Sequence, residues 1–252
     1  MKQFNLIFRT FFALSIVLAF HTAIAAQDSG KKVALTSFFV DRQIGLSDVS
    51  GNVAAARDIL ALAKDTSFNL QSVLHDFKTK FFADYVQHFP FTLKPEAEVI
   101  GNTEYQAFEE AFTFDFVRPL TPNGYKIMYP GGFLQKKENR NQNEMLRIFP
   151  DADGIMYVFI DYSFVRKVAI AGMGSAGIRA TCNIWLYNKA GKPVFRIAEG
   201  ANSKGSVPLI ANIPVMSADK ILPLCKDASA RLLEDLMGRL PKIAKKAAKK
   251  LK

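Results

Sequence analysis

The alternation of apolar and polar residues indicates a chain that contains both strands and helices. Residues 33–40 are almost continuously apolar, as in a strand buried on both faces. Residues 155–165 form the strongest strand pattern, and residues 91–93 suit a short strand. Two further strand patterns, 178–187 and 193–198, flank the turn residues 188–192. These last two segments predict a β-hairpin.

Apolar residues recur at helical spacing in the remaining regular segments. Asp65, Thr66 and Ser67 form a capping cluster before a long helix that Pro90 ends, and Ser217 can cap a second long helix near the C-terminus. The predicted helices cover residues 53–63, 68–88, 102–111, 142–149 and 218–240.

The order of these elements predicts an α/β (α+β) fold with a single mixed β-sheet covered by long helices. No linker divides the chain, so residues 26–241 are expected to form one domain. Residues 113–144 interrupt the pattern with prolines, a Gly131-Gly132 pair and a polar run at 136–143. We expect this segment to be an irregular insertion that serves as a contact surface.

The first 25 residues have the pattern of an export signal. Lys2 and Arg9 precede the apolar run 10–20, and Ala23 and Ala25 supply the small residues that signal peptidase reads. An 11-residue helix spans about 16 Å, against roughly 30 Å of membrane hydrocarbon. We therefore predict a signal peptide and an exported product, periplasmic or secreted. No later segment reaches 18 apolar residues, so no transmembrane span is expected in the mature chain.

Composition and charge narrow the classes of partner. The chain has 252 residues, of which 49% are hydrophobic and 22% charged, which excludes disordered, collagen-like and coiled-coil proteins. The formal net charge is +10, but Lys2 and Arg9 leave with the signal and six lysines lie in the last 11 residues. Residues 26–241 then carry only about +2, so a nucleic-acid face is not expected.

The C-terminal tail, residues 242–252, is amphipathic, with apolar residues on one side and lysines on the other. It is either a solvated helix end or a contact for anionic lipid or cell-wall polymer. The lysines concerned are Lys242, Lys245, Lys246, Lys249, Lys250 and Lys252.

Cys182 and Cys225 are the only cysteines. Export permits a disulfide between them. However, a helix packed on a sheet usually holds Cα atoms about 10 Å apart, beyond the roughly 7 Å limit for a disulfide. A disulfide and two buried free thiols both remain possible on the sequence.

No catalytic or cofactor motif stands in its required context. Residues 172–177 fit G-x-G-x-x-G, but a strand pattern follows instead of a helix, so a loop between strands is expected. His75 and His88 are thirteen residues apart on the predicted helix and point about 220° apart. Asp151 and Asp153 resemble the start of a calcium loop without its remaining ligands, which favours a turn. We expect no enzyme, no cofactor and no metal.

The 22 phenylalanines are interpreted mainly as core residues. Phe112, Phe114 and Phe116 lie in an irregular stretch, where part of them could be exposed. These three residues are the predicted partner patch.

Four segments together resemble a family of envelope proteins. They are a strand at 32–38, a short strand at 91–95, a turn and strong strand at 152–158, and a hairpin at 185–195. In this order they are similar to the curli secretion lipoprotein CsgG, the lipoprotein activators of penicillin-binding proteins and the N-terminal domain of TolB. The resemblance covers roughly residues 32–240 and implies a non-enzymatic module that binds envelope partners. This chain departs from it in the missing lipoprotein cysteine and in residues 113–144.

Together these features predict an exported, non-enzymatic protein that binds protein partners or the anionic envelope surface. The alternative is a periplasmic carrier of a small apolar ligand or lipid, in which phenylalanines would line a pocket.

Overall fold

The computed structural model describes residues 30–46, 49, 53–110, 117–130, 135–170 and 173–248. Within this part of the chain, seven strands form one mixed sheet in the order β2-β1-β3-β4-β6-β7, and β5 also pairs with β4. β1 runs parallel to β2 and β3, and the other pairs are antiparallel. The strands are β1 (Lys32–Gly45), β2 (Thr92–Leu93), β3 (Gly154–Ile170), β4 (Met173–Asn188), β5 (Pro193–Asn202), β6 (Val207–Ile210) and β7 (Ile213–Pro214).

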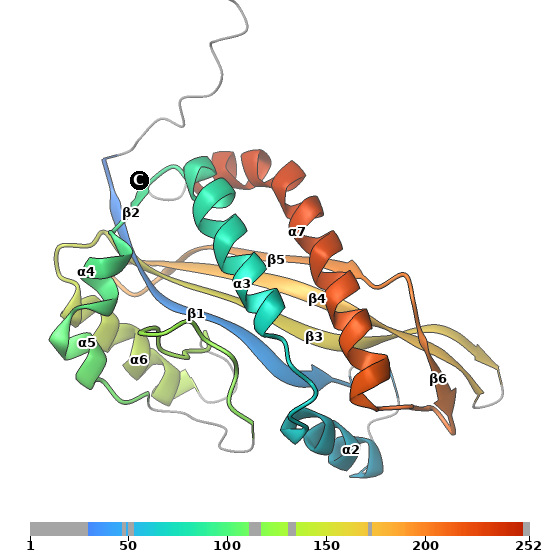
Figure 1. The fold of residues 1–252 in the computed structure, drawn as a ribbon. Coiled ribbons are helices and arrows are strands. Elements are labelled where there is room, and N and C mark those ends of the chain that lie inside the picture. Colours follow the sequence, from blue (N-terminus) through green and yellow to red (C-terminus); the bar gives the residue numbers. More distant parts are fainter. Residues whose placement is uncertain are drawn as a thin grey trace, which may run out of the picture.

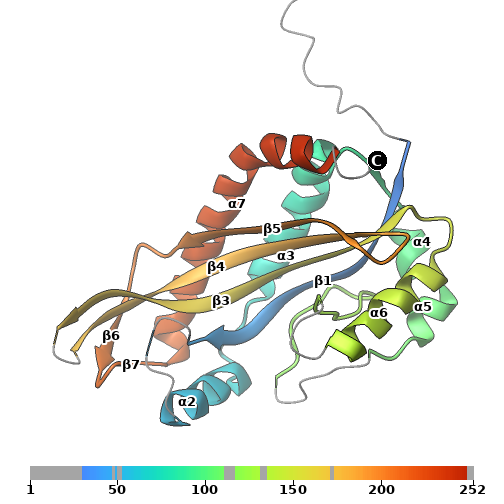
Figure 2. The same ribbon diagram turned by 180° about the vertical axis from the view of Figure 1, so that it is seen from behind.

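The helices lie on both faces of the sheet. α3 and the long α7 cover one face, called here the α7 face (Figure 1). α4, α5 and α6 lie at one end of the opposite face (Figure 2). The six α-helices of the described residues are α2 (Val53–Lys64), α3 (Gln71–Lys80), α4 (Glu96–Ile100), α5 (Thr103–Ala107), α6 (Gln135–Ile148) and α7 (Ala218–Ala248). The predicted fold class, one mixed sheet covered by helices, is confirmed.

The main core lies between the sheet and the pair α3 and α7. Phe38 of β1 contacts the rings of Phe77 and Phe81 with centroids 4.7 and 5.4 Å apart. Buried hydroxyl groups fix α7 against this core. The Tyr85 hydroxyl donates to the Leu233 carbonyl at 2.6 Å, and the hydroxyls of Tyr162 and Ser229 lie 2.7 Å apart. Since buried polar groups need such partners, these bonds fix how α7 crosses the sheet.

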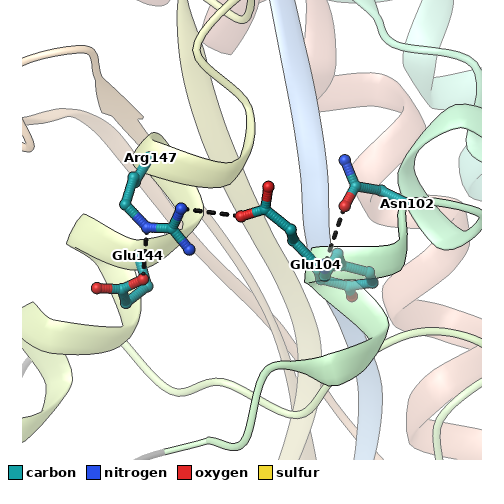
Figure 3. A network of polar contacts seen from close by, with 5 residues as sticks. Asn102, Glu104, Glu144 and Arg147 are labelled. Carbon is teal, nitrogen blue, oxygen red and sulfur yellow. Dashed lines mark hydrogen bonds and ion pairs between the residues drawn. The ribbon is translucent and has the colours of Figure 1, made fainter.

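A smaller core lies under α5 and α6 on the opposite face. Their junction is closed by charges at the surface, where Arg147 binds Glu104 at 2.8 Å and Glu144 at 2.9 Å (Figure 3). Asn102 caps α5 by accepting a hydrogen bond from the Tyr105 backbone N–H at 2.9 Å. Such exposed ion pairs add little stability, and the buried residues below them hold α6 in place.

Several element boundaries differ from the prediction. The single helix expected over 68–88 is α3 followed by a π-helical turn, η1 (Phe81–Tyr85), and a 3-10 turn, η2 (Val86–His88). The wider π turn keeps both Phe81 and Tyr85 inside the core. The polar run 136–143, expected as loop, belongs to α6. Single-sequence patterns did not show α4, β6 and β7 at all.

The segment expected as an irregular insertion, 113–144, is partly integrated into the fold. In its described residues, Leu120 bridges Val40 and Lys126 bridges Ser37, both on β1. Ile127 and Met128 are buried. This part of the segment therefore packs along β1. Among the described residues, no helix is both long and apolar enough to span a membrane.

Tyr105 joins this segment to a β-bulge in β1. The register with β3 skips Thr36, and the Tyr105 hydroxyl donates to the Thr36 carbonyl at 2.7 Å. The same hydroxyl accepts the Lys126 backbone N–H at 2.8 Å. Tyr157, on β3, is also fully buried, but its hydroxyl has no hydrogen-bond partner.

These two tyrosines form a matched pair for mutation. Tyr105→Phe should lower the free energy of unfolding by about 1–3 kcal/mol, because it leaves buried backbone groups without their partner. Tyr157→Phe should be neutral or slightly stabilising, because it removes a hydroxyl that burial leaves unbonded. Urea unfolding of both variants checks this. Equal losses in the two variants would contradict the assigned bonding.

Candidate functional site

The structure places only part of the predicted site residues. Phe112, Phe114 and Phe116 lie outside the described residues. The backbone of α7 continues through Ala248, but the side chains from Lys242 onward are not described, and residues 249–252 lie outside the described part. The predicted partner patch and lysine contact therefore stay predictions.

Cys182 and Cys225 are both buried and both free thiols, so the structure shows the second of the two alternatives left open by the sequence. Burial raises the pKa of each thiol well above its usual value. A thiol in this state is protonated and a poor nucleophile. Both residues thus serve as small apolar side chains in the core.

The other candidate motifs have structural roles. Residues 173–177 of the glycine motif are in β4, so the loop expected there is strand from Met173 onward. His75 is exposed on α3, and His88 is in η2. Asp151 forms an ion pair with Lys94, and the Asp153 carboxylate accepts the Lys32 backbone N–H at 2.8 Å. This aspartate-rich turn fastens the start of β1 to the start of β3.

The sheet ends in an apolar surface that sequence analysis missed. β3 and β4 are 17 and 16 residues long, and their ribbon extends past the N-terminal end of α7, with β6 beside it (Figures 1 and 2). Four large apolar side chains are exposed among the described residues: Val168 (54%), Ile170 (73%), Met173 (71%) and Ile210 (65%). All four lie at this end, and we call them the apolar tip.

The strand register places the apolar tip on one face. Ile170 pairs with Met173, and Val168 lies two residues before Ile170. β6 pairs Leu209 with Gly174, so one further step brings Ile210 opposite Met173. Directly paired residues share a face of a sheet. The four side chains thus form one continuous exposed apolar patch across three strands.

A β-bulge at Lys167 determines the face of the sheet on which the apolar tip lies. The register of β3 skips one residue between Arg166 and Val168. Side chains alternate along a strand, so one extra residue exchanges the two faces. Tyr162 and Phe164 point into the core on the α7 face, but Val168 and Ile170 point to the opposite face. Without the bulge, the apolar tip would lie on the α7 face.

The bulge is held by the Lys167 side chain. Its ammonium group donates to the carbonyls of Ser203, Lys204 and Gly205 at 2.9, 2.6 and 2.9 Å. Its stem crosses β4 at Gly177, where an added Cβ would lie 2.7 Å from Lys167 Cε. The absent side chain at Gly177 therefore lets Lys167 reach the connection between β5 and β6. This connection is also held by Ser203, whose hydroxyl accepts the Ile178 N–H at 3.0 Å.

The sequence around the apolar tip is basic. Three basic residues, Arg166, Lys167 and Lys204, lie near this end of the ribbon, and the Asp227 carboxylate of α7 accepts the Lys204 backbone N–H. Arg166 and Lys204 are exposed. Arg166 pairs with Ala176 and so lies on the α7 face of the ribbon, close along the strand to the aliphatic patch on the opposite face.

A second feature is a hollow of about 560 Å³, open to solvent, at the end of β1, which we call the polar hollow after its two aspartates, although Ile44 and Leu46 also line it. Asp41 and Asp161 line it, together with Gln43 and Ser163, and α2 contributes Ala56 and Ile59. Asp41 stands at another bulge, where the register between β1 and β3 jumps from Val40 to Ile44. A charged residue within or directly after an almost wholly apolar strand was the sequence signal for both aspartates.

Hydrogen bonds position the two carboxylates. The Tyr129 hydroxyl donates to Asp41 at 2.9 Å, and the Asn183 amide donates to Asp161 at 2.7 Å. The pKa of Asp161 is raised to about 6, mainly by burial and also by the nearby Asp41 charge, whereas the hydrogen bond from Asn183 lowers it. Burial also raises the pKa of Asp41. The hollow can therefore hold a proton at mildly acidic pH, but within the described residues no group of three metal-ligating side chains is present.

No protein-family model matches the sequence, and neither does any curated protein. Three solved structures show a distant likeness. The lipoprotein GNA1162 of Neisseria meningitidis has 9% identity and a TM-score of 0.29, over 68% of this chain and 82% of that one. Protein CT253 of Chlamydia trachomatis has 8% identity and a TM-score of 0.30, over 84% and 98%. A homologue of neuraminyllactose-binding hemagglutinin from Helicobacter pylori has 9% identity and a TM-score of 0.34, over 92% and 95%.

These comparisons give a distant similarity to a bacterial lipoprotein and two other bacterial proteins, and no sequence family. At TM-scores below 0.5 they carry no argument about function. The finer resemblance to CsgG, the penicillin-binding-protein activators and TolB stays a prediction.

Thiol titration tests the state of the cysteines. In denaturant without reductant, a thiol reagent should label both Cys182 and Cys225, because neither is in a disulfide. In the native chain at neutral pH it should label neither, because both are buried and protonated. Zero labelling in denaturant would show the disulfide instead.

The pH dependence of stability tests the polar hollow. The folded state binds the Asp161 proton more tightly than the unfolded chain, whose pKa is near 3.8. This group therefore lowers the free energy of unfolding as the pH rises from about 4 to about 6. Asp161→Asn should remove that loss and gain about 1–3 kcal/mol over the wild type between pH 4 and pH 7. A difference independent of pH, measured by urea unfolding, would contradict the shifted pKa.

Proposed function

We propose that this chain is an exported, non-catalytic binding protein of the cell envelope that contacts its partner through the apolar tip. One observation carries the proposal. The exposed large apolar side chains of the described residues are not scattered but gathered at one projecting end. Burying such a side chain is worth about 1.5–3 kcal/mol, so a patch of four is a strong candidate for an interaction surface.

The pattern of residues 1–25 supports export. The absence of catalysis is part of the proposal, and the state of the reactive residues supports it. The two thiols are buried with raised pKa values. The glycine motif belongs to a paired strand, where its amides hydrogen-bond to neighbouring strands.

The aromatic packing favours a binding surface over the alternative, a carrier of an apolar ligand. Phe89 stacks on Phe91 at 5.1 Å, and Phe39 stacks on Phe159 at 4.8 Å. These rings contact one another directly. The hollow at Asp41 and Asp161 is open to solvent, whereas a carrier site buries most of the surface of its ligand.

Sedimentation with isolated envelope fragments tests the proposal. The exported form, residues 26–252, should sediment with the fragments, and Ile210→Asp should weaken binding at least about tenfold by placing a charge in the patch. Ala198→Asp is the matched control, because Ala198 is also exposed and lies on β5, away from the tip. Binding that Ile210→Asp leaves unchanged would remove the apolar tip from the proposed function.

A further inference from the structure

We infer that the partner of the apolar tip is an anionic lipid surface, into which the end of the β3–β4 hairpin inserts. This inference rests on the proposed function and names its partner. The other possible partner, an envelope protein, is an outcome of the test below.

Charge near the apolar tip favours an anionic surface. Arg166 and Lys204 are exposed: Arg166 comes two residues before Val168, on the α7 face opposite Ala176, and Lys204 is in the connection between β5 and β6. One carboxylate of α7, that of Asp227, accepts the Lys204 backbone N–H. Lysine and arginine near an anionic membrane contribute to binding at low ionic strength and lose effect with salt. Anionic headgroups can therefore pair with Arg166 and Lys204, while the lipid tails contact the side chains of the apolar tip.

The spacing along the ribbon suits the depth of an interfacial segment. Arg166 pairs with Ala176 and Ile170 pairs with Met173, so with the bulge between them they are about three strand residues apart, roughly 10 Å. Interfacial protein segments bury their apolar side about 5–10 Å into the boundary between headgroups and acyl chains. With Ile170 and Met173 at that depth, Arg166 reaches the level of the lipid phosphates. The distance thus permits apolar and ionic contacts at the same time.

The backbone of the tip is largely paired within the protein. A segment can enter an apolar phase only when its N–H and C=O groups are paired within the protein. β3 and β4 stay paired out to Ile170 and Met173, β6 pairs with β4 there, and β7 pairs with β6. β4 is therefore paired on both sides beneath the exposed side chains, and in the described residues the open edge is that of β3, whose pairing with β1 ends at Ser163.

The composition of the apolar tip favours lipid over a protein pocket. Centres of protein interfaces are enriched in Trp, Tyr and Arg. The apolar tip contains only Val, Ile and Met. Aliphatic side chains without an aromatic or polar anchor suit a fluid lipid phase better than a shaped protein pocket.

Vesicle sedimentation tests this inference with the exported form, residues 26–252. Vesicles of phosphatidylcholine with phosphatidylglycerol should bind the protein, and Ile170→Thr/Met173→Thr should weaken this binding at least about tenfold. Ile170→Leu/Met173→Leu is the matched control, which keeps the patch apolar and should change binding less than about twofold. Circular dichroism and the melting temperature show that each variant folds.

Two further variants separate the sources of binding. Arg166→Gln/Lys204→Gln should weaken binding to the phosphatidylglycerol vesicles about tenfold and leave the weaker binding to pure phosphatidylcholine unchanged. Deletion of residues 242–252 removes the lysine tail, which follows the other end of α7, and should leave most vesicle binding intact. It also tests the tail contact predicted from the sequence.

Three results would overturn the inference. The first is equal vesicle binding by the wild type and Ile170→Thr/Met173→Thr. The second is loss of binding on tail deletion alone. The third is absence of vesicle binding by a wild type that still binds envelope fragments through Ile210. This last result leaves the proposed function intact and assigns the apolar tip to an envelope protein.

Discussion

The β-bulge at Lys167 is the constraint that places the apolar tip on the face of the sheet opposite α7. In a regular ribbon, Val168 and Ile170 would follow Tyr162 and Phe164 to the α7 face. One extra residue turns them to the other face, and three carbonyl bonds from the Lys167 ammonium hold it there. The exposed patch is therefore built into the strand pairing and does not result from a poorly packed end.

Two other bulges follow the same principle on β1. At Thr36, which the register with β3 skips, the Tyr105 hydroxyl donates a hydrogen bond to the Thr36 carbonyl. After Val40, the Asp41 carboxylate accepts two hydrogen bonds. One comes from the Gln43 backbone N–H at 2.9 Å, within the same bulge, and the other from the Tyr129 hydroxyl. In each case a side chain replaces a partner that the regular sheet would have supplied. The bulge at Thr36 joins the connecting segment 117–130 to the sheet, and the bulge after Val40 forms part of the polar hollow.

Local sequence patterns were sufficient for the fold class and insufficient for both surface features. The alternation in residues 155–165 and the apolar stripe of the last helix gave the sheet and α7, because their periodicity is local. The end of β3–β4 contains several glycines and alanines among its apolar residues, which favoured a loop prediction, and its pairing with β6 joins segments more than 30 residues apart. The partners of Lys167 are 36 to 38 residues away. Asp41 and Asp161 are separated by 120 positions, so only the three-dimensional sheet brings them into one hollow.

The central claim is that the apolar tip enters a lipid surface, and a depth measurement tests it most directly. A spin label attached at Ile170→Cys can be compared with one at Ala190→Cys, in the exposed turn between β4 and β5 at the far end of the ribbon; both native thiols are buried. On addition of phosphatidylglycerol vesicles, the label at position 170 should become more accessible to oxygen and less accessible to a water-soluble nickel complex. The label at position 190 should stay aqueous. A label at position 170 that stays equally aqueous would contradict the account.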